Sequence, residues 1–118
     1  MDPLKGMKKG RWTFDKNAYD KWGKKNFEKA VFYVDKLLAL TKKYNIKMSI
    51  AIYPWPHQLY KNEVNGLYET TWTKWAQKND VPILNLFGEF FKNNETPLTT
   101  IKHFYIDGDI HFNKNGNR

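Results

Sequence analysis

Apolar residues between positions 16 and 44 recur every three or four residues, which is the period of an α-helix. Asp15 and Thr13 are the two candidate caps for its start. Four lysines on this segment share a face away from the apolar stripe, which suits a helix with one side in solvent: Lys25, Lys29, Lys36 and Lys43. We therefore predict one long amphipathic helix whose apolar stripe packs against the core.

The pattern after this helix changes to short, nearly continuous apolar runs separated by turn residues. Such runs are typical of parallel strands that are buried on both faces. Pro54 and Pro56 end the first run sharply. In chain order we predict a strand at 46–53, a loop at 54–58, a helix at 66–78, a strand at 81–86, a short helix at 88–92, and a loop through Pro97 to a short extended piece at 103–106.

The order of these elements predicts an α/β fold with a parallel sheet. Two strands make a very small sheet, and the apolar stripe of the long helix exceeds what two strands can cover. We expect the rest of the sheet to come from outside these residues, either from a missing amino-terminal half or from another subunit through self-association. Asn113 favours a fragment, because it is a typical helix cap with no helix after it.

The length and composition agree with part or all of one domain and exclude several classes of protein. The 118 residues include no Cys, which excludes a disulfide scaffold and zinc sites built from Cys. No apolar run reaches the roughly 18 residues of a membrane span, and the first residues do not have the pattern of a signal peptide. The localisation stays unknown, because an upstream region would carry any targeting signal.

The positive charge is concentrated in the first part of the chain. Lys and Arg number 20 against 12 Asp and Glu, a net charge of +8, and residues 1–47 account for that excess. Together with the many aromatic residues, this leaves open a basic binding module for nucleic acid or an acidic surface. Lys predominates over Arg, however, and Arg is the residue that reads bases best. We therefore favour a solvated helix and do not expect nucleic acid as the partner.

Residues with acid–base chemistry cluster near the end of the chain: His103, Asp107, Asp109 and His111. In an extended segment, side chains two residues apart point the same way, so Asp109 is placed to meet His111. A carboxylate that accepts the Nδ1 hydrogen leaves Nε2 free to act as a general base. An ordinary Asp-Gly turn with an incidental His is the alternative. The spacing does not favour a metal site, and we expect no cofactor.

The ending Tyr105-Ile-Asp-Gly-Asp-Ile-His-Phe-Asn-Lys-Asn-Gly-Asn resembles the last conserved block of SGNH/GDSL hydrolases. The segment Ile52-Tyr-Pro-Trp-Pro-His-Gln58 is similar to a branch of bacterial SGNH-like proteins. The resemblance covers most of the chain, but only as the carboxyl-terminal half of a three-layer, flavodoxin-like fold. It implies that residues 1–118 are one portion of a single such domain.

The resemblance also implies a serine-nucleophile esterase or O-acyltransferase that acts on an acyl ester or an O-acylated carbohydrate. His111 would be the general base, with Asp109, or alternatively Asp107, as its orienting carboxylate. Trp55, His57 and Gln58 would line the substrate, while Asn113 would cap the next helix and Gly116 would allow close packing.

The block that carries the family's nucleophile is absent from these residues. The one Ser, Ser49, lies within a predicted strand that we expect to be buried, so it is assigned a structural role. The chain is therefore expected to be inactive alone. A catalytically dead scaffold of the same fold remains the other possibility.

Overall fold

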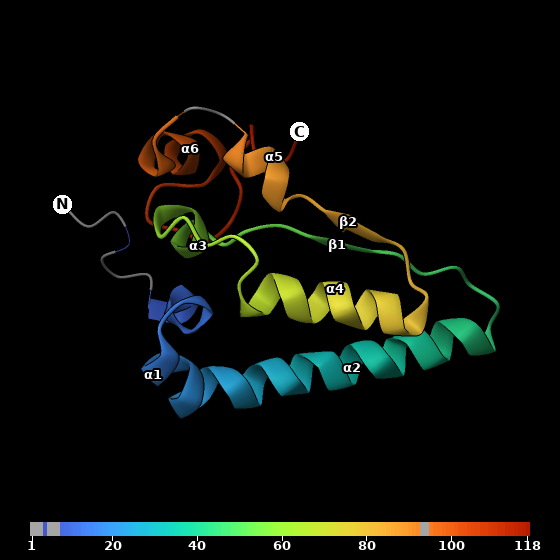
Figure 1. Cartoon of the computed structure of the whole chain (residues 1–118). Coiled ribbons are helices and arrows are strands. Elements are labelled where there is room, and N and C mark those ends of the chain that lie inside the picture. Colours follow the sequence, from blue (N-terminus) through green and yellow to red (C-terminus); the bar gives the residue numbers. More distant parts are fainter. Residues whose placement is uncertain (1–3, 5–7, 93–94) are drawn as a thin grey trace.

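The protein is described here by a computed structural model that covers Leu4, residues 8–92 and residues 95–118 (Figure 1). Its regular helices are α1 (Lys16–Ala18), α2 (Lys24–Lys43), α3 (Pro56–Tyr60), α4 (Leu67–Asn79), α5 (Phe87–Phe91) and α6 (Pro97–Phe104). Its strands are β1 (Ile50–Ile52) and β2 (Ile83–Asn85). A 3-10 helix (Lys8–Thr13) and a π-helical turn (Tyr19–Gly23) complete the order. The fold is α/β with a small parallel sheet.

The predicted long helix exists, although it is not regular throughout. The Asp15 side chain accepts hydrogen bonds from the backbone N–H groups of Asn17 and Ala18 and so begins α1. The π-helical turn then joins α1 to α2, so that helical backbone runs from Lys16 to Lys43. Gly23 lies in this turn because a Cβ atom there would approach the Trp12 Cβ to 2.5 Å.

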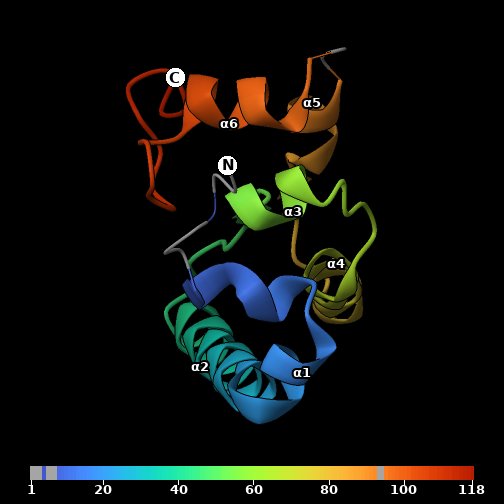
Figure 2. The same ribbon diagram turned by 90° about the vertical axis from the view of Figure 1, so that its left-hand side faces the viewer.

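β1 and β2 pair in parallel, with Ile50 opposite Ile83 and Ile52 opposite Asn85. Both strands are shorter than the sequence predicts, because the flanking apolar residues have no third strand to pair with in the described part of the chain. Each strand therefore has one free edge. Leu84 is also largely exposed, because α2 and α4 lie on the opposite face of the sheet (Figures 1 and 2).

Two apolar clusters hold these elements together. The larger joins α2, α4 and both strands, and its buried members are Phe27, Leu38, Ile52, Trp72, Trp75, Ala76, Val81 and Phe87. The Trp75 indole N–H also donates to the Asp35 carboxylate at 2.7 Å, which ties α4 to α2. The smaller cluster lies at the carboxyl ends of the strands, where Leu59, Ile101 and Tyr105 bring α3 under α6 (Figure 2).

Two predictions about segments that contain proline are wrong. Residues 54–58 were expected to be a loop, yet helix α3 begins at Pro56, which suits the first turn of a helix because its missing N–H needs no partner there. Pro97 occupies the same position in α6, after Thr96, whose side chain caps the helix. This helix replaces most of the extended piece expected at 103–106, of which only Tyr105 forms a β-bridge, with Phe112.

Candidate functional site

The carboxyl-terminal segment folds back on itself directly after α6. Tyr105 and Phe112 form an antiparallel bridge, and the Ile106 N–H donates to the His111 carbonyl at 3.0 Å. Gly108 forms the tip of this loop with a φ of +71°, a left-handed conformation that glycine adopts without a steric penalty. The loop therefore holds Asp109 and His111 on one arm of a tight reversal.

The Asp109 and His111 side chains contact each other as predicted by their spacing. Asp109 Oδ1 lies 2.8 Å from His111 Nδ1 and also accepts from the backbone N–H groups of Ile110 and His111. The hydrogen bond with His111, followed by the one from Ile110, lowers the pKa of the Asp109 carboxyl. An ionised carboxylate only accepts hydrogen bonds, so the imidazole carries its hydrogen on Nδ1 when neutral.

This arrangement leaves Nε2 of the neutral His111 with a free lone pair. Asp109 rather than Asp107 supplies the carboxylate, since no contact from Asp107 to His111 occurs within the described residues. The imidazole is 75% exposed and the Asp109 side chain 47% exposed, so the pair is accessible to a molecule that approaches from outside. Chemically, the pair is a general base held in one tautomer.

Aromatic packing fixes this loop against the carboxyl end of β1. The Phe112 ring lies 4.7 Å from the Tyr53 ring, directly after β1, and 4.8 Å from the Tyr105 ring, measured between centroids. Tyr105 is buried, and its hydroxyl donates to the Pro54 carbonyl. Burial raises the pKa of Tyr105 well above its usual range, so the hydroxyl remains a donor. Sequence reasoning missed Phe112, although its place between the predicted base and cap pointed to a structural role.

Asn113 and Gly116 hold the other side of the loop. The Asn113 side-chain oxygen accepts from the N–H groups of Asn115 and Gly116, which is the geometry of a helix cap. Its amide also donates to the carbonyls of His103 and Tyr105 and so attaches the turn to the end of α6. At Gly116 a Cβ atom would lie 2.2 Å from the Phe104 carbonyl oxygen, and only glycine fits this approach.

The three residues predicted to line the substrate lie in different environments. Trp55 is half-buried and lines a groove beside β1. His57 and Gln58 are fully buried in α3, where the Gln58 side chain accepts from the Trp55 N–H and caps the helix. The 3-10 helix covers His57 so closely that a Cβ on Gly10 would overlap the imidazole. Substrate contact by His57 and Gln58 stays a prediction that would require this covering to move.

Ser49 does not lie at the Asp109–His111 pair. It is exposed rather than buried, which corrects the expectation from sequence, and it precedes β1 at the amino end of the strand. The pair lies beyond the opposite end, where Phe112 contacts Tyr53. Four residues of extended chain separate these ends by roughly 13 Å. Ser49 is therefore not a nucleophile for His111.

A buried carboxylate that the sequence did not single out organises the same end of the sheet. Glu69 of α4 accepts from the Asn85 side chain at 2.7 Å and from the Asn65 backbone N–H at 2.6 Å. Asn85 in turn accepts from the Phe87 N–H and begins α5. The sequence gives little indication of this role for Glu69, because a single Glu inside a predicted helix is ordinarily solvated.

Within the described residues no three His, Asp or Glu side chains are close enough to hold a metal ion. The helices in this part of the chain also lack the length and apolar character that crossing a membrane requires. Comparison with protein-family models, curated proteins and solved structures finds no match to this chain.

Proposed function

We propose that this chain supplies the Asp–His half of a serine-type acyl-transfer site, and that the nucleophile comes from a polypeptide region outside these residues. The observation that carries the proposal is the 2.8 Å contact between Asp109 Oδ1 and His111 Nδ1, which leaves an exposed Nε2. The reaction would be hydrolysis of an ester or transfer of its acyl group. His111 would take the proton of the attacking hydroxyl and later return it to the leaving alcohol.

The location of the pair supports the same function. In open α/β sheets, ligands bind at the carboxyl ends of the strands. The loop with Asp109 and His111 packs on Tyr53, directly after β1, and therefore lies at that edge. The finer proposal is a three-layer SGNH-like domain in which further strands extend the sheet and further helices cover the face that exposes Leu84.

The experiment compares the chain alone with the chain co-expressed with the polypeptide encoded beside it. The chain alone should not hydrolyse an activated acetate ester, because a base without a nucleophile has nothing to activate. The co-expressed pair should hydrolyse the ester and react with a fluorophosphonate at a serine of the second polypeptide. Asp109→Asn should lower kcat about 10⁴-fold, by analogy with other triads.

His103→Ala is the matched control for His111→Ala. His103 is also exposed and lies on the end of α6 with its ring against Phe104, so its removal should leave turnover unchanged. If the chain alone hydrolyses the ester and His111→Ala abolishes this activity, the proposal that the nucleophile comes from outside these residues is wrong. Turnover by the pair that survives His111→Ala would overturn the assignment of the base.

A further inference from the structure

One edge of β1 is open along its whole length. The Ile50 N–H donates to the Pro82 carbonyl and the Ile52 carbonyl accepts from Leu86, so both residues face β2. In a parallel pair, alternate residues point their backbone groups to opposite edges. The N–H and C=O of Ala51 therefore face away from β2, where no other strand pairs with β1 within the described residues.

An apolar groove of about 530 Å³ runs beside this edge, and we call it the β1 groove. Its walls come mainly from β1, α2 and α4, and its lining includes Ala30, Val34, Leu37, Ala51, Trp55 and Trp72. A groove with unpaired backbone groups along one wall suits an extended polypeptide, since such a chain satisfies those groups by hydrogen bonding.

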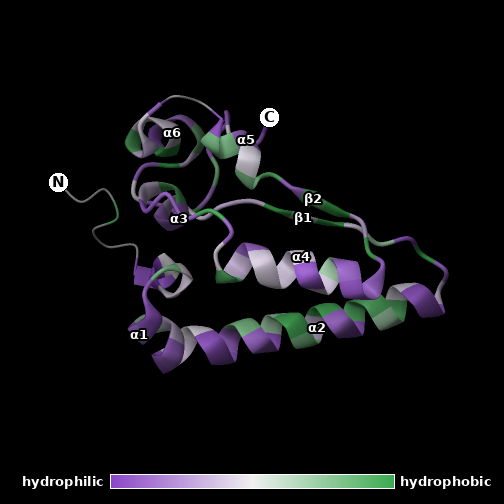
Figure 3. Ribbon diagram, viewed as in Figure 1, coloured by the Kyte–Doolittle hydropathy of each residue, from purple (hydrophilic) through white to green (hydrophobic). Residues whose placement is uncertain are grey.

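The apolar surface continues from the groove over α2. Four large side chains at steps of three and four are exposed by 48% or more, and these are Tyr33, Leu37, Leu40 and Tyr44 (Figure 3 colours the helix by hydropathy). Leu37 belongs both to this stripe and to the groove. Large exposed apolar patches mark interaction surfaces in folded proteins.

Charged residues beside the stripe are all basic. Lys29, Lys36 and Lys43 are spaced by seven residues, so they follow one flank of the stripe. At 100° per residue, the acidic residues Glu28 and Asp35 fall on the opposite face of the helix from the stripe, where the Trp75 indole of α4 donates to Asp35. The open side of the surface therefore has a row of lysines without carboxylates between them.

We propose that the β1 groove binds an apolar β-strand of a partner polypeptide whose flanking residues are Asp and Glu. The strand would pair with the Ala51 edge and lay its apolar side chains on α2, while its carboxylates would meet Lys29 and Lys36. A second copy of this chain does not fit, because a two-fold interface would bring two chains of net charge +8 and two rows of lysines together. The lining of the β1 groove includes neither Asp109 nor His111, so either proposal stands if the other fails.

The probe is a fluorescent synthetic peptide with about six alternating Val and Thr residues flanked by Glu at both ends. We expect the full chain to bind it in an anisotropy titration and to bind a Lys-flanked version more weakly. The double variant Lys29→Glu/Lys36→Glu should weaken binding of the Glu-flanked peptide about tenfold and reverse the preference. Lys74→Glu/Lys78→Glu changes the net charge equally on exposed positions of α4 outside the groove and should leave the affinity unchanged.

Amide hydrogen exchange provides a second readout that does not depend on charge. The Ala51 N–H should exchange more slowly when the peptide is bound, while the Ile50 N–H, which already donates to Pro82, should change little. Equal affinity for the two peptides, or unchanged exchange at Ala51, would overturn the proposal. Dimerisation of the chain that excludes the peptide, or its displacement by a single-stranded oligonucleotide, would assign the surface to another occupant and overturn it as well.

Discussion

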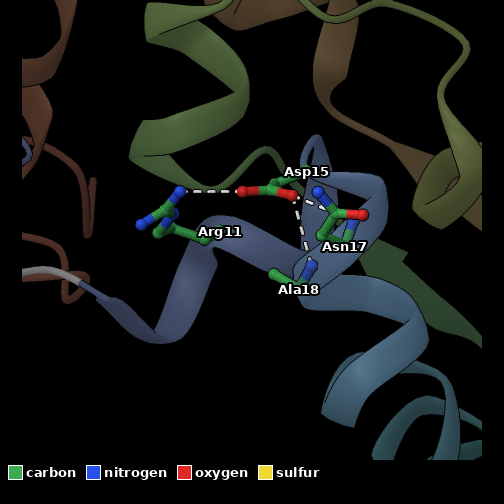
Figure 4. Close-up of polar contacts among 4 residues, drawn as sticks. All are labelled: Arg11, Asp15, Asn17 and Ala18. Atoms are coloured by element: carbon green, nitrogen blue, oxygen red, sulfur yellow. Dashed lines mark hydrogen bonds and ion pairs between the residues drawn. The ribbon is translucent and has the colours of Figure 1, made fainter.

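The two ends of this chain contain carboxylates in similar surroundings, Asp15 before α1 and Asp109 in the carboxyl-terminal loop. Each accepts two backbone N–H groups from the residues that follow it, and each contacts one basic side chain at 2.8 Å. Figure 4 shows Asp15 between Arg11 and the N–H groups of Asn17 and Ala18. In both, the hydrogen bonds lower the pKa of the carboxyl.

The chemistry of the basic partner distinguishes the helix cap at Asp15 from the candidate catalytic pair at Asp109. Arg11 is always protonated and has no acceptor, so its contact with Asp15 only joins the 3-10 helix to α1. His111 has a second nitrogen, and its contact with Asp109 determines which nitrogen is free. Geometry around a carboxylate therefore does not identify a reactive site, whereas the chemistry of its partner does.

The largest expected effect on stability comes from a substitution at Gly116, which holds the carboxyl-terminal loop of Asp109 against the end of α6. Gly116→Ala places a Cβ 2.2 Å from the Phe104 carbonyl oxygen, and because this neighbour is backbone, the loop must move. We expect about 2 kcal/mol of lost stability, which is typical of overpacking, measured by urea unfolding. The hydrogen bonds that Asp15 accepts from the N–H groups of Asn17 and Ala18 should be unaffected.

Gly88→Ala is the matched control, because a Cβ at Gly88 in α5 meets no atom within 4 Å. Alanine favours a helix by roughly 0.5–1 kcal/mol over glycine, so this variant should be neutral or more stable. Equal destabilisation by the two variants would show that the close approach at Gly116 does not hold the loop.

The residues that could be predicted from sequence are those whose partners are close in the chain. Asp15 and Asn113 make their cap contacts with residues two and three positions later, and Asp109 reaches His111 two positions away. The long helix was predictable for the same reason, because its period is local. The π-helical turn was not, since Gly23 is required by contact with Trp12.

The features that sequence did not reveal depend on distant partners. His57 is buried by Gly10, which lies 47 positions earlier, and the Tyr105 hydroxyl bonds to Pro54 across 51 positions. Helices α3 and α6 were missed because Pro56 and Pro97 were interpreted as breaks, although proline also begins helices. The exposure of Ser49 follows from the absence of a strand beside β1 in the described residues.

A smaller effect, on the pKa of each carboxyl, is expected when its basic partner is replaced. Each variant should raise the pKa of its carboxyl. His111→Gln removes the largest cause of the lowering at Asp109, whereas Arg11→Gln leaves in place the largest cause at Asp15, which is the hydrogen bond from the N–H of Ala18. Carboxyl carbon shifts in an NMR titration measure both values.

The same variants test the pH dependence of stability. Because both folded-state pKa values lie below that of an unfolded Asp, about 3.9, each carboxylate stabilises the fold above that pH. The stabilisation is lost as the pH falls through the lowered folded value. His111→Gln and Arg11→Gln should therefore each flatten the acid limb of the stability curve, and an unchanged acid limb in His111→Gln would contradict the assigned cause at Asp109.

The smallest effect on stability is expected from replacing each carboxylate by its amide. Asp15→Asn should leave the melting temperature nearly unchanged, because Asn caps helices as well as Asp does and keeps an oxygen for the N–H groups of Asn17 and Ala18. Asp109→Asn also keeps an oxygen for its backbone donors. Its effect should instead fall on His111, whose neutral tautomer is no longer fixed by an acceptor-only group.

Imidazole nitrogen shifts measured on the neutral ring distinguish the two tautomers of His111. In the unchanged chain the hydrogen should reside on Nδ1, facing Asp109 Oδ1 at 2.8 Å. In Asp109→Asn the side-chain oxygen and the amide nitrogen compete for this position, because the same Oδ1 also accepts from the N–H groups of Ile110 and His111. Where the nitrogen takes it, the amide donates to Nδ1 and the hydrogen moves to Nε2, which removes the free lone pair that a general base needs. A hydrogen that stays on Nδ1 in both chains would show that the loop backbone, not the carboxylate, fixes the imidazole, and the resemblance between Asp109 and the cap residue Asp15 would then be complete.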